Sequence, residues 1–370
     1  MGEALNIDRR EAPPGRNRAG PIRVLIVDDS LTARTVLSRL IDAEADMEVV
    51  AKATTAEMAL ARLREHVVDV ILLDLEMPGM GGLEALPQIL KAANGGQVLV
   101  VSSLTEDGAE ATLAALSMGA ADTMLKPRPG QFDDAYRARL TAHVRALGRT
   151  MRPGDAAPDA APVQKSPASP RRASPKDPKV LAIGASTGGI HALCLLLRAL
   201  PRQLDIPVLV TQHLPGSFMS VLARQLELAA SREAVVAQEG TVIAPGRIYV
   251  APGEGHMLLH RSGARTSVRI AAFPTSSGCT PAVDPMLESL AQAVDGQALA
   301  VILSGMGRDG AEGAARLVER GGTVFAQDRA TSAVWGMPRG VVDAGLASAV
   351  LPPEALAEEI VGATGAAAWK

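Results

Sequence analysis

Short apolar runs alternate with segments of helical periodicity over the first part of the chain. The first run, "RVLIV", precedes "LTARTVLSRLIDAE", in which Leu37, Leu40 and Ile41 fall on one helix face. Four more such pairs follow: "EVVAKA" with "AEMALARLREH", "DVILLDL" with "GLEALPQILKAA", "QVLVVSS" with "GAEATLAALSMG", and "ADTMLKP" with "DDAYRARLTAHVRALG". Five consecutive βα units predict a flavodoxin-like (βα)5 domain, a parallel sheet covered by helices on both faces.

The same alternation resumes at Lys179. The apolar runs "VLAIGA", "PVLVTQ" and "LAVILSG" are each followed by a helical pattern, and "TVFAQD" comes after them. Between the second and third units lies "TVIAPGRIYVAPGEGHMLLHR", which is β-like and punctuated by glycine and proline. This pattern predicts a second doubly wound, mostly parallel α/β domain.

Proline-rich sequence separates the two halves. Residues 148–178 contain few large apolar side chains and cannot build a core, so they are expected to form a linker. Residues 1–20 are similarly polar and are expected to be a disordered tail. The predicted domains are therefore residues 21–147 and residues 179–370.

Composition narrows the class of protein. The 370 residues are 47% hydrophobic and 21% charged with a net charge of −3, which favours a folded protein over a disordered one and argues against nucleic-acid binding. Two cysteines cannot make a disulfide framework, and no Cys/His spacing fits a zinc site. No apolar run is long enough to cross a membrane, and the N-terminal residues contain no apolar h-region of the kind a signal peptide has. We therefore expect a cytoplasmic protein without membrane insertion.

Polar side chains follow the strands of the first domain. Asp28 and Asp29 come after the first strand, Asp74 after the third, Ser102 after the fourth and Lys126 after the fifth. Strand carboxyl ends meet at one sheet edge. Clustered carboxylates favour Mg²⁺, and a hydroxyl with an ammonium group suits a phosphoryl group. A single aspartate after a strand is more often a helix cap or turn residue, but the combination points to chemistry.

Together with "VDDS", "DLEMPGMGG", "SSLT" and "KP", this constellation makes residues 22–148 resemble the response-regulator receiver domain. The resemblance implies that Asp74 accepts a phosphoryl group from a chemotaxis-type histidine kinase and that Lys126 and Ser102 contact that group. It further implies a Mg²⁺ site formed by Asp28, Asp29, Asp74 and the main-chain carbonyl of Glu76. Receivers usually carry an aromatic residue where this chain has Thr123.

The segment "GASTG", residues 184–188, fits the G-x-S-x-G pattern between a strand and a helix, which is the setting of a nucleophile elbow. Two other interpretations of Ser186 fit the sequence less well. A helix N-cap would not explain the surrounding glycines. A phosphate-binding loop would need a G-x-G-x-x-G or P-loop pattern that the sequence does not supply.

A serine nucleophile needs a base and an orienting carboxylate. Among six histidines, His213 directly follows the strand "PVLVTQ", at the same predicted edge as Ser186. Asp309 follows the strand in "LAVILSGMGRDG" and is preferred over Asp284, which no clear strand precedes, and Asp328, which suits a turn. The order Ser, His, Asp differs from that of α/β-hydrolases.

The motifs "IGASTGG", "TQHLPGSF", "PGRIYVAPGEGHM", "LSGMGRDGAEG" and "AQDRATSAVWGMP" resemble the catalytic domain of the chemotaxis protein-glutamate methylesterases, the CheB family. The resemblance implies Ser186 as nucleophile, His213 as general base, Asp309 as its orienter, Thr187 as a substrate-binding residue and a main-chain oxyanion donor near Met306. It also implies a phosphorylation-activated esterase, without a cofactor of its own, that acts on γ-glutamyl methyl esters of chemoreceptor cytoplasmic helices and deamidates receptor glutamines.

Two other functions remain possible on the sequence. A phosphorylation-controlled binding protein could keep the same motifs without catalysis, and the Ser186→Ala variant separates it from an enzyme. A transcription regulator would need a DNA-binding output domain, and the second half shows no short basic helical module. The resemblance and the linker together imply that the unphosphorylated receiver covers the catalytic cleft.

Overall fold

A computed structural model describes residues 20–102, 106–126, 133–149, 177–202 and 204–365. The expected tail (residues 1–20) and linker (residues 148–178) fall almost entirely outside the described residues. Within the described part of the chain, no helix is both long and apolar enough to cross a membrane.

The first domain is the expected (βα)5 domain. Its five strands are parallel and stand in the order β2-β1-β3-β4-β5. The strands are β1 (Ile22–Val27), β2 (Met47–Ala53), β3 (Val70–Leu73), β4 (Gln97–Ser102) and β5 (Asp122–Leu125). The helices are α1 (Leu31–Asp42), α2 (Ala56–Glu65), α3 (Gly82–Ala92), α4 (Glu106–Met118) and α5 (Asp134–Gly148).

Local sequence explains where the helices of this domain begin. The Ser30 hydroxyl accepts a hydrogen bond from the Ala33 amide at 3.3 Å and caps α1, and Asp133 caps α5 in the same way. Leu37 and Ile41 of α1 are buried against the sheet, as the helical periodicity predicts.

The second domain has a seven-stranded sheet in the order β14-β13-β12-β6-β7-β9-β8, with every neighbouring pair parallel. Its strands are β6 (Val180–Ala185), β7 (Val208–Gln212), β8 (Ala234–Val236), β9 (Ile248–Val250), β12 (Ala298–Ile302), β13 (Thr323–Gln327) and β14 (Ala349–Leu351). The helices are α6 (Gly189–Ala199), η1 (Gly216–Phe218), α7 (Met219–Ala230), α8 (Val283–Ala293), α9 (Ala311–Glu319), α10 (Met337–Asp343) and α11 (Pro353–Thr364).

The glycine- and proline-rich β-like segment divides between two sheets. Its first part supplies β9, and its second part supplies β10 (His256–Ser262), which pairs antiparallel with β11 (Arg265–Ala271) as a separate hairpin. The prediction of a mostly parallel α/β domain is confirmed, with this hairpin as its antiparallel exception.

Strand β6 is the middle strand of this seven-stranded sheet. It pairs with β12 on one side and with β7 on the other, so the chain leaves β6 at a point where successive connections run in opposite directions. Open α/β sheets bind ligands at such a switch point, in the crevice beyond the carboxyl ends of the strands. The segments that follow β6, β7 and β12 therefore meet at one place.

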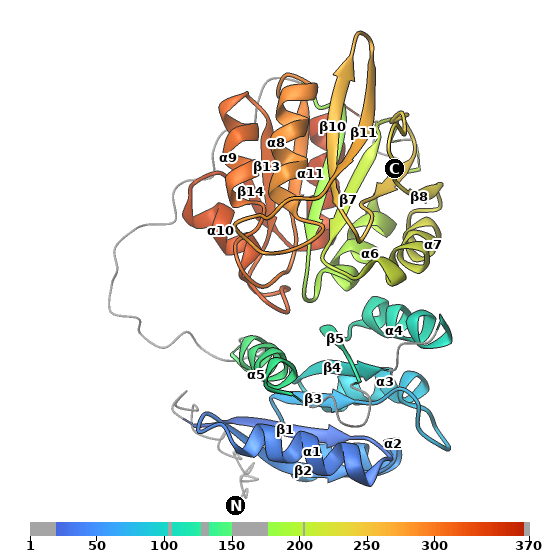
Figure 1. Cartoon of the computed structure of the whole chain (residues 1–370), viewed down its shortest axis with the longest axis vertical. Helices are drawn as coiled ribbons and strands as arrows, with labels where there is room; N and C mark the ends of the chain where they lie inside the picture. The colour runs from blue at the N-terminus through green and yellow to red at the C-terminus, as the bar shows by residue number, and fades with distance from the viewer. Residues whose placement is uncertain (1–19, 103–105, 127–132, 150–176, 203, 366–370) are drawn as a thin grey trace, which may run out of the picture.

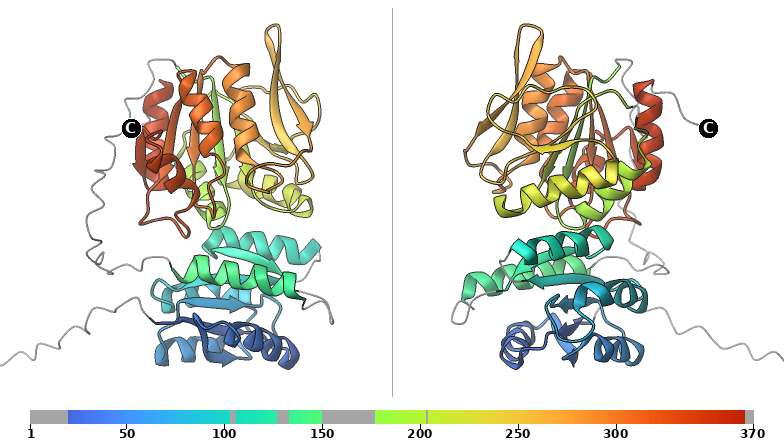
Figure 2. Two further views of the ribbon diagram at one scale, coloured as in Figure 1. Left: turned by 60° about the vertical axis from the view of Figure 1, so that its left-hand side comes forward. Right: turned by 90° about the vertical axis from the view of Figure 1, so that its right-hand side faces the viewer.

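The two domains pack together through one edge of the first domain. Helices α4 and α5 and strand β5 face the second domain (Figures 1 and 2), and α4 packs against α6 and α7. The Gly188 amide donates to the Ala121 carbonyl at 2.5 Å, and His191 Nδ1 donates to the Ser117 carbonyl at 2.8 Å. Val334 of the second domain is buried in the hydrophobic cluster of the first.

Candidate phosphorylation and active sites

The acidic side chains of the first domain meet at the carboxyl ends of β1 and β3. One carboxylate oxygen from each of Asp28, Asp29 and Asp74 lies within 4.8 Å of the others. Asp28 and Asp74 are buried, whereas Asp29 is exposed. Three carboxylates in this arrangement are hard oxygen donors of the kind that Mg²⁺ takes, and the exposed side leaves room for its waters.

Lys126 lies across this acidic cluster. Its Nζ is 2.7 Å from Asp74 Oδ2 and 2.8 Å from Asp28 Oδ2. Burial raises the pKa of Asp74, although Lys126 and the Glu76 amide, which donates to Asp74 Oδ1 at 3.0 Å, oppose that shift. Lys126 therefore compensates the charge of two buried carboxylates.

Ser102 ends β4 close to this cluster. Its Oγ accepts a hydrogen bond from Thr112 Oγ1 of α4 at 2.8 Å, and its carbonyl accepts the Lys126 amide at 2.7 Å. The position where receivers usually carry an aromatic residue is Thr123 on β5, whose Oγ1 is buried without a hydrogen-bond partner in the described part of the chain. Ser102 and Thr123 thus adjoin the edge that packs on the second domain.

Ser186 lies in the turn between β6 and α6. Gly188 takes a left-handed conformation with φ of 74°, and a side chain there would overlap Ala333 and Ser304. The Gln212 side chain and the Ser304 carbonyl fix the backbone of the turn, through bonds of 3.0 Å to the Ser186 carbonyl and amide. Glycine at this turn is therefore a packing requirement as well as a conformational one.

The segment after β12 runs beside the serine. A Cβ placed on Gly305 would lie 2.9 Å from Ser186 Cβ, so the backbone between Ser304 and Gly307 passes close to the hydroxyl. Met306, near which the family resemblance implies an oxyanion donor, lies in this segment, and its side chain packs toward the first domain. The main chain between Ser304 and Gly307 is therefore part of the immediate surroundings of the Ser186 side chain.

His213 and Asp309 are brought together by β7 and by the loop before α9. His213 Nε2 donates to Asp309 Oδ2 at 2.7 Å, and the side chains are 13% and 1% exposed. Asp309 also accepts the amides of Val283 (2.7 Å), Asp284 (3.1 Å) and Gly310 (3.0 Å). Four donors thus fix both carboxylate oxygens and leave no freedom for the carboxylate to turn.

These bonds set the protonation of the pair. Burial alone would lower the pKa of His213, but Asp309 and the thiol of Cys279 raise it to about 9. Burial would raise the pKa of Asp309, but the bonds from His213 and Val283 outweigh burial and hold that pKa below its ordinary value. Since Nε2 is bonded to Asp309, Nδ1 is the ring nitrogen that could accept a proton from Ser186.

One of the rival carboxylates, Asp284, adjoins Asp309, which accepts its amide. Asp328 accepts the Thr331 amide at 3.1 Å in an exposed turn, as its sequence context suggests. Asp284 begins α8 and accepts the Gly313 amide at 2.7 Å, and burial raises its pKa to about 7. Neither residue has a hydrogen bond to His213 among the described residues.

Two features of the site were not expected from the sequence. The first is Cys279, whose contact with His213 lowers the pKa of the thiol. The second is an interdomain bond: Thr187 Oγ1 donates to Asp122 Oδ2 of the first domain at 2.5 Å. Ser186 and His213 share no hydrogen bond among the described residues.

Comparison with known proteins agrees with this architecture. The receiver-domain family model matches residues 24–136, and the CheB methylesterase model matches residues 181–360. The "protein-glutamate methylesterase/protein-glutamine glutaminase 2" of Caulobacter vibrioides is 44% identical over 336 residues, covering 90% of this chain and 95% of the relative. The corresponding protein 1 of Paramagnetospirillum magneticum is 41% identical, covering 90% and 93%.

Among solved structures, the CheB methylesterase catalytic domain of Thermotoga maritima is 34% identical, with a TM-score of 0.49, and covers 50% of this chain and 98% of that one. A receiver domain joined to a catalytic α/β domain defines a response regulator with an enzymatic output. The family matches and the full-length relatives go further: this chain belongs to the CheB family of protein-glutamate methylesterases.

Proposed function

We propose that this chain hydrolyses γ-glutamyl methyl esters on the cytoplasmic helices of chemoreceptors and deamidates receptor glutamines by the same route. The supporting observation is the pairing of His213 Nε2 with Asp309 Oδ2 at 2.7 Å, one strand away from Ser186. Relatives of nearly equal length bear the name of this activity.

The proposed reaction is an acyl transfer through Ser186. Nδ1 of His213 takes the serine proton as Oγ attacks the ester carbonyl, and the imidazolium, held by Asp309, returns the proton to the departing methoxide. Water then hydrolyses the acyl-enzyme with His213 again acting as the base. With a glutamine substrate, ammonia leaves in place of methanol.

The developing oxyanion needs fixed donors, which usually supply the largest share of the stabilisation. The backbone between Ser304 and Gly307, which passes beside Ser186, is our candidate for this role. Thr187 is the candidate for binding the substrate. In the docked arrangement its hydroxyl is engaged by Asp122, so the receiver withholds a substrate-binding group.

Regulation follows from the same contact surface. The receiver packs on the serine turn through β5 and α4, where a bulky receptor helix would have to enter. Phosphorylation of Asp74 by a chemotaxis-type histidine kinase would draw Lys126 and Ser102 toward the phosphoryl group and alter this edge. Asp28, Asp29, Asp74 and the Glu76 carbonyl would hold Mg²⁺, which supplies charge neutralisation for phosphoryl transfer when bound.

The test of this proposal is methanol release from methylated receptor membranes by the full chain, with and without acetyl phosphate and Mg²⁺. We expect the phosphodonor to raise the rate about 5- to 150-fold, the usual range of coupling between sites. Asp74→Asn should keep the basal rate and lose the stimulation. Asp134→Asn, an exposed aspartate at the start of α5, should behave as wild type.

Stimulation that survives in Asp74→Asn would overturn the assigned phosphorylation site. Methanol release that occurs but never responds to the phosphodonor would overturn the regulatory part and leave the esterase assignment standing. Chelation of Mg²⁺ should remove the stimulation and leave the basal rate.

The pH dependence of this reaction should report His213. Only the neutral imidazole accepts the serine proton, so kcat/KM for methanol release should rise with pH through about 9. Because the Cys279 thiol helps to raise this pKa, Cys279→Ser should move the rise to lower pH. Cys194→Ala, a change at a buried cysteine of α6, should leave the position of the rise unchanged. A rise in kcat/KM centred near pH 6.5 in wild type would contradict the raised pKa of His213.

A further inference from the structure

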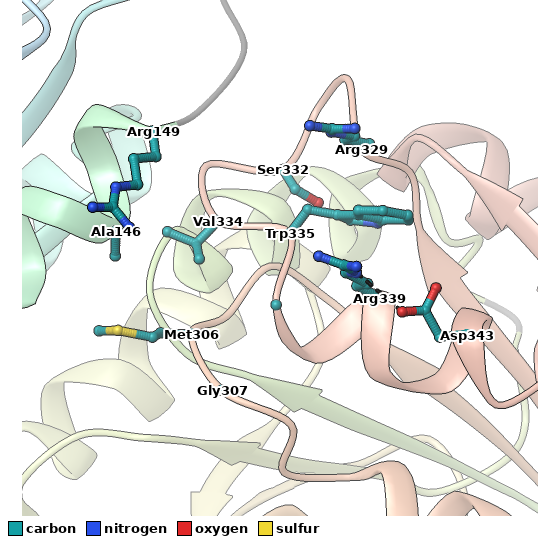
Figure 3. A pocket seen from close by; sticks show the side chains of 11 residues that line it. Ala146, Arg149, Met306, Gly307, Arg329, Ser332, Val334, Trp335, Arg339 and Asp343 are labelled. Carbon is teal, nitrogen blue, oxygen red and sulfur yellow. Dashed lines mark hydrogen bonds and ion pairs between the residues drawn. The ribbon is translucent and has the colours of Figure 1, made fainter. Parts of the chain in front are cut away.

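A cavity lies between the two domains, and part of its lining, Met306 and Gly307, belongs to the segment that passes beside Ser186. It has a volume of about 490 Å³ and opens between α5 and the segment that joins β13 to α10 (Figure 3). The first domain contributes Ala146 and Arg149 to its lining, and the second domain contributes the remainder. Occupation of this cavity would therefore involve both domains at once.

The lining of the cavity is positively charged. It contains three arginines and a single carboxylate, which leaves two net positive charges: the residues are Arg149, Arg329, Arg339 and Asp343. Arg149, which directly follows α5, lies across the pocket from Arg329 and Arg339 (Figure 3). Guanidinium groups bind phosphate and carboxylate groups through paired hydrogen bonds, so the lining favours an anion with more than one charge.

Two of these arginines are weakly held by carboxylates. Arg149 pairs with Asp46 at only 3.5 Å, because Asp46 already accepts two bonds from Arg145 at 2.8 and 2.9 Å. Arg329 has no carboxylate within 4.0 Å in the described part of the chain, and its guanidinium lies 5.8 Å from the Trp335 ring centre. Both groups are thus available to an incoming anion.

Arg339 is held more closely by a carboxylate than Arg149 or Arg329, because its Nε pairs with Asp343 at 3.0 Å on the same helix. Both side chains are more than half exposed, so this pair is weak. A phosphate group could compete for the guanidinium of Arg339 without displacing a buried partner.

The remainder of the wall is apolar. Met306 and Val334 face the cavity beside the indole of Trp335, whose Nε1 donates to the Gln327 carbonyl at 3.2 Å and so fixes the ring. A volume of this size corresponds to an organic ligand, and a bare inorganic anion would leave the apolar wall uncovered. The cavity therefore combines an anion-binding side with a wall for a flat or apolar group.

We propose that this cavity binds a small phosphorylated organic anion, of the class of a nucleoside diphosphate, and that the ligand joins the two domains by contacting Arg149 and Arg329 together. A ligand that binds only the docked arrangement stabilises it, and separation of the domains weakens binding by the same factor. Because the docked receiver covers the serine turn in the proposed function, a ligand that stabilises docking should also lower esterase activity. That consequence rests on the proposed function, whereas binding itself does not.

Isothermal titration calorimetry of the full chain tests the site, with ADP, inorganic pyrophosphate and adenosine as probes. We expect one ADP per chain and weaker but measurable binding of pyrophosphate. Arg329→Ala and Arg149→Ala should each weaken ADP binding about tenfold or more, as loss of a charged hydrogen bond does. Arg316→Ala, which removes an exposed arginine paired with Glu319 on α9, is the matched control and should bind as wild type.

The outcomes separate the parts of the proposal. No heat with ADP, adenosine binding as tightly as ADP, or equal losses in Arg329→Ala and Arg316→Ala would each overturn the anion site. Loss in Arg329→Ala but not in Arg149→Ala would overturn the joining of the domains. Because calorimetry does not depend on ester hydrolysis, these results stand whether or not methanol release is observed.

Discussion

Replacing Ser186 by alanine should lower methanol release from methylated receptors by about four to six orders of magnitude, as loss of a serine nucleophile does. The fold should be unaffected, because the Ser186 hydroxyl makes no hydrogen bond among the described residues and its backbone contacts with Ser304 and Gln212 remain. The thermal midpoint is therefore expected to stay within about a degree of wild type, since surface changes of this kind rarely exceed 0.5 kcal/mol.

The matched control is Ser262→Ala, at the exposed tip of the β10–β11 hairpin. It should leave both the rate and the midpoint unchanged. Retention of methanol release in Ser186→Ala would contradict the proposed mechanism. Receptor binding that persists in this variant, with no methanol release from wild type under any condition, would instead support a phosphorylation-controlled binding protein.

The fold could be predicted because its signals are local. The central strands of both sheets, such as β3, β6 and β12, are short, nearly continuous apolar runs, which is the pattern that a strand buried on both faces requires. The helix that contains Leu37 and Ile41 is recognisable from its periodicity and from Ser30 before it. The hairpin of β10 and β11 was not resolved from β9, because glycine and proline mark turns without showing which sheet the following strand joins.

The candidate catalytic residues could be placed near one another because the end of a strand fixes a position in space. His213 follows β7, which pairs with β6 so that Ala185 lies beside Gln212, and this register places His213 near Ser186. The position of Asp309 is less directly fixed by its strand, since Asp309 lies seven residues beyond the end of β12. What distinguishes Asp309 from Asp284 is the set of amides that surrounds its carboxylate, which depends on how α8 and α9 pack.

The contacts between domains could not be predicted residue by residue. The pairing of Thr187 with Asp122 joins residues 65 positions apart on separate domains, and no periodicity or spacing carries that relation. The same holds for Cys279, which reaches His213 from the loop before α8. Such contacts come from docking of preformed surfaces, for which a single sequence contains no local signal.

Asp309→Asn should be nearly as damaging to activity as loss of the serine and should also destabilise the fold. The carboxylate accepts the Val283, Asp284 and Gly310 amides in addition to His213 Nε2. An asparagine in the same place would turn its NH2 group toward two of these donors and leave them unpaired. We expect a loss of about 10³- to 10⁴-fold in methanol release, as when the orienting carboxylate of a triad becomes an amide.

The stability cost should be about 2–4 kcal/mol by urea unfolding, because buried donors lose their acceptor. Asp328→Asn is the matched control, since Asp328 caps an exposed turn at Thr331 and should cost little in either measurement. Asp309→Asn also removes the bond that raises the pKa of His213, so its residual activity should rise at lower pH than in wild type. A destabilised variant with an unshifted pH profile would show that Asp309 supports the fold without orienting the base.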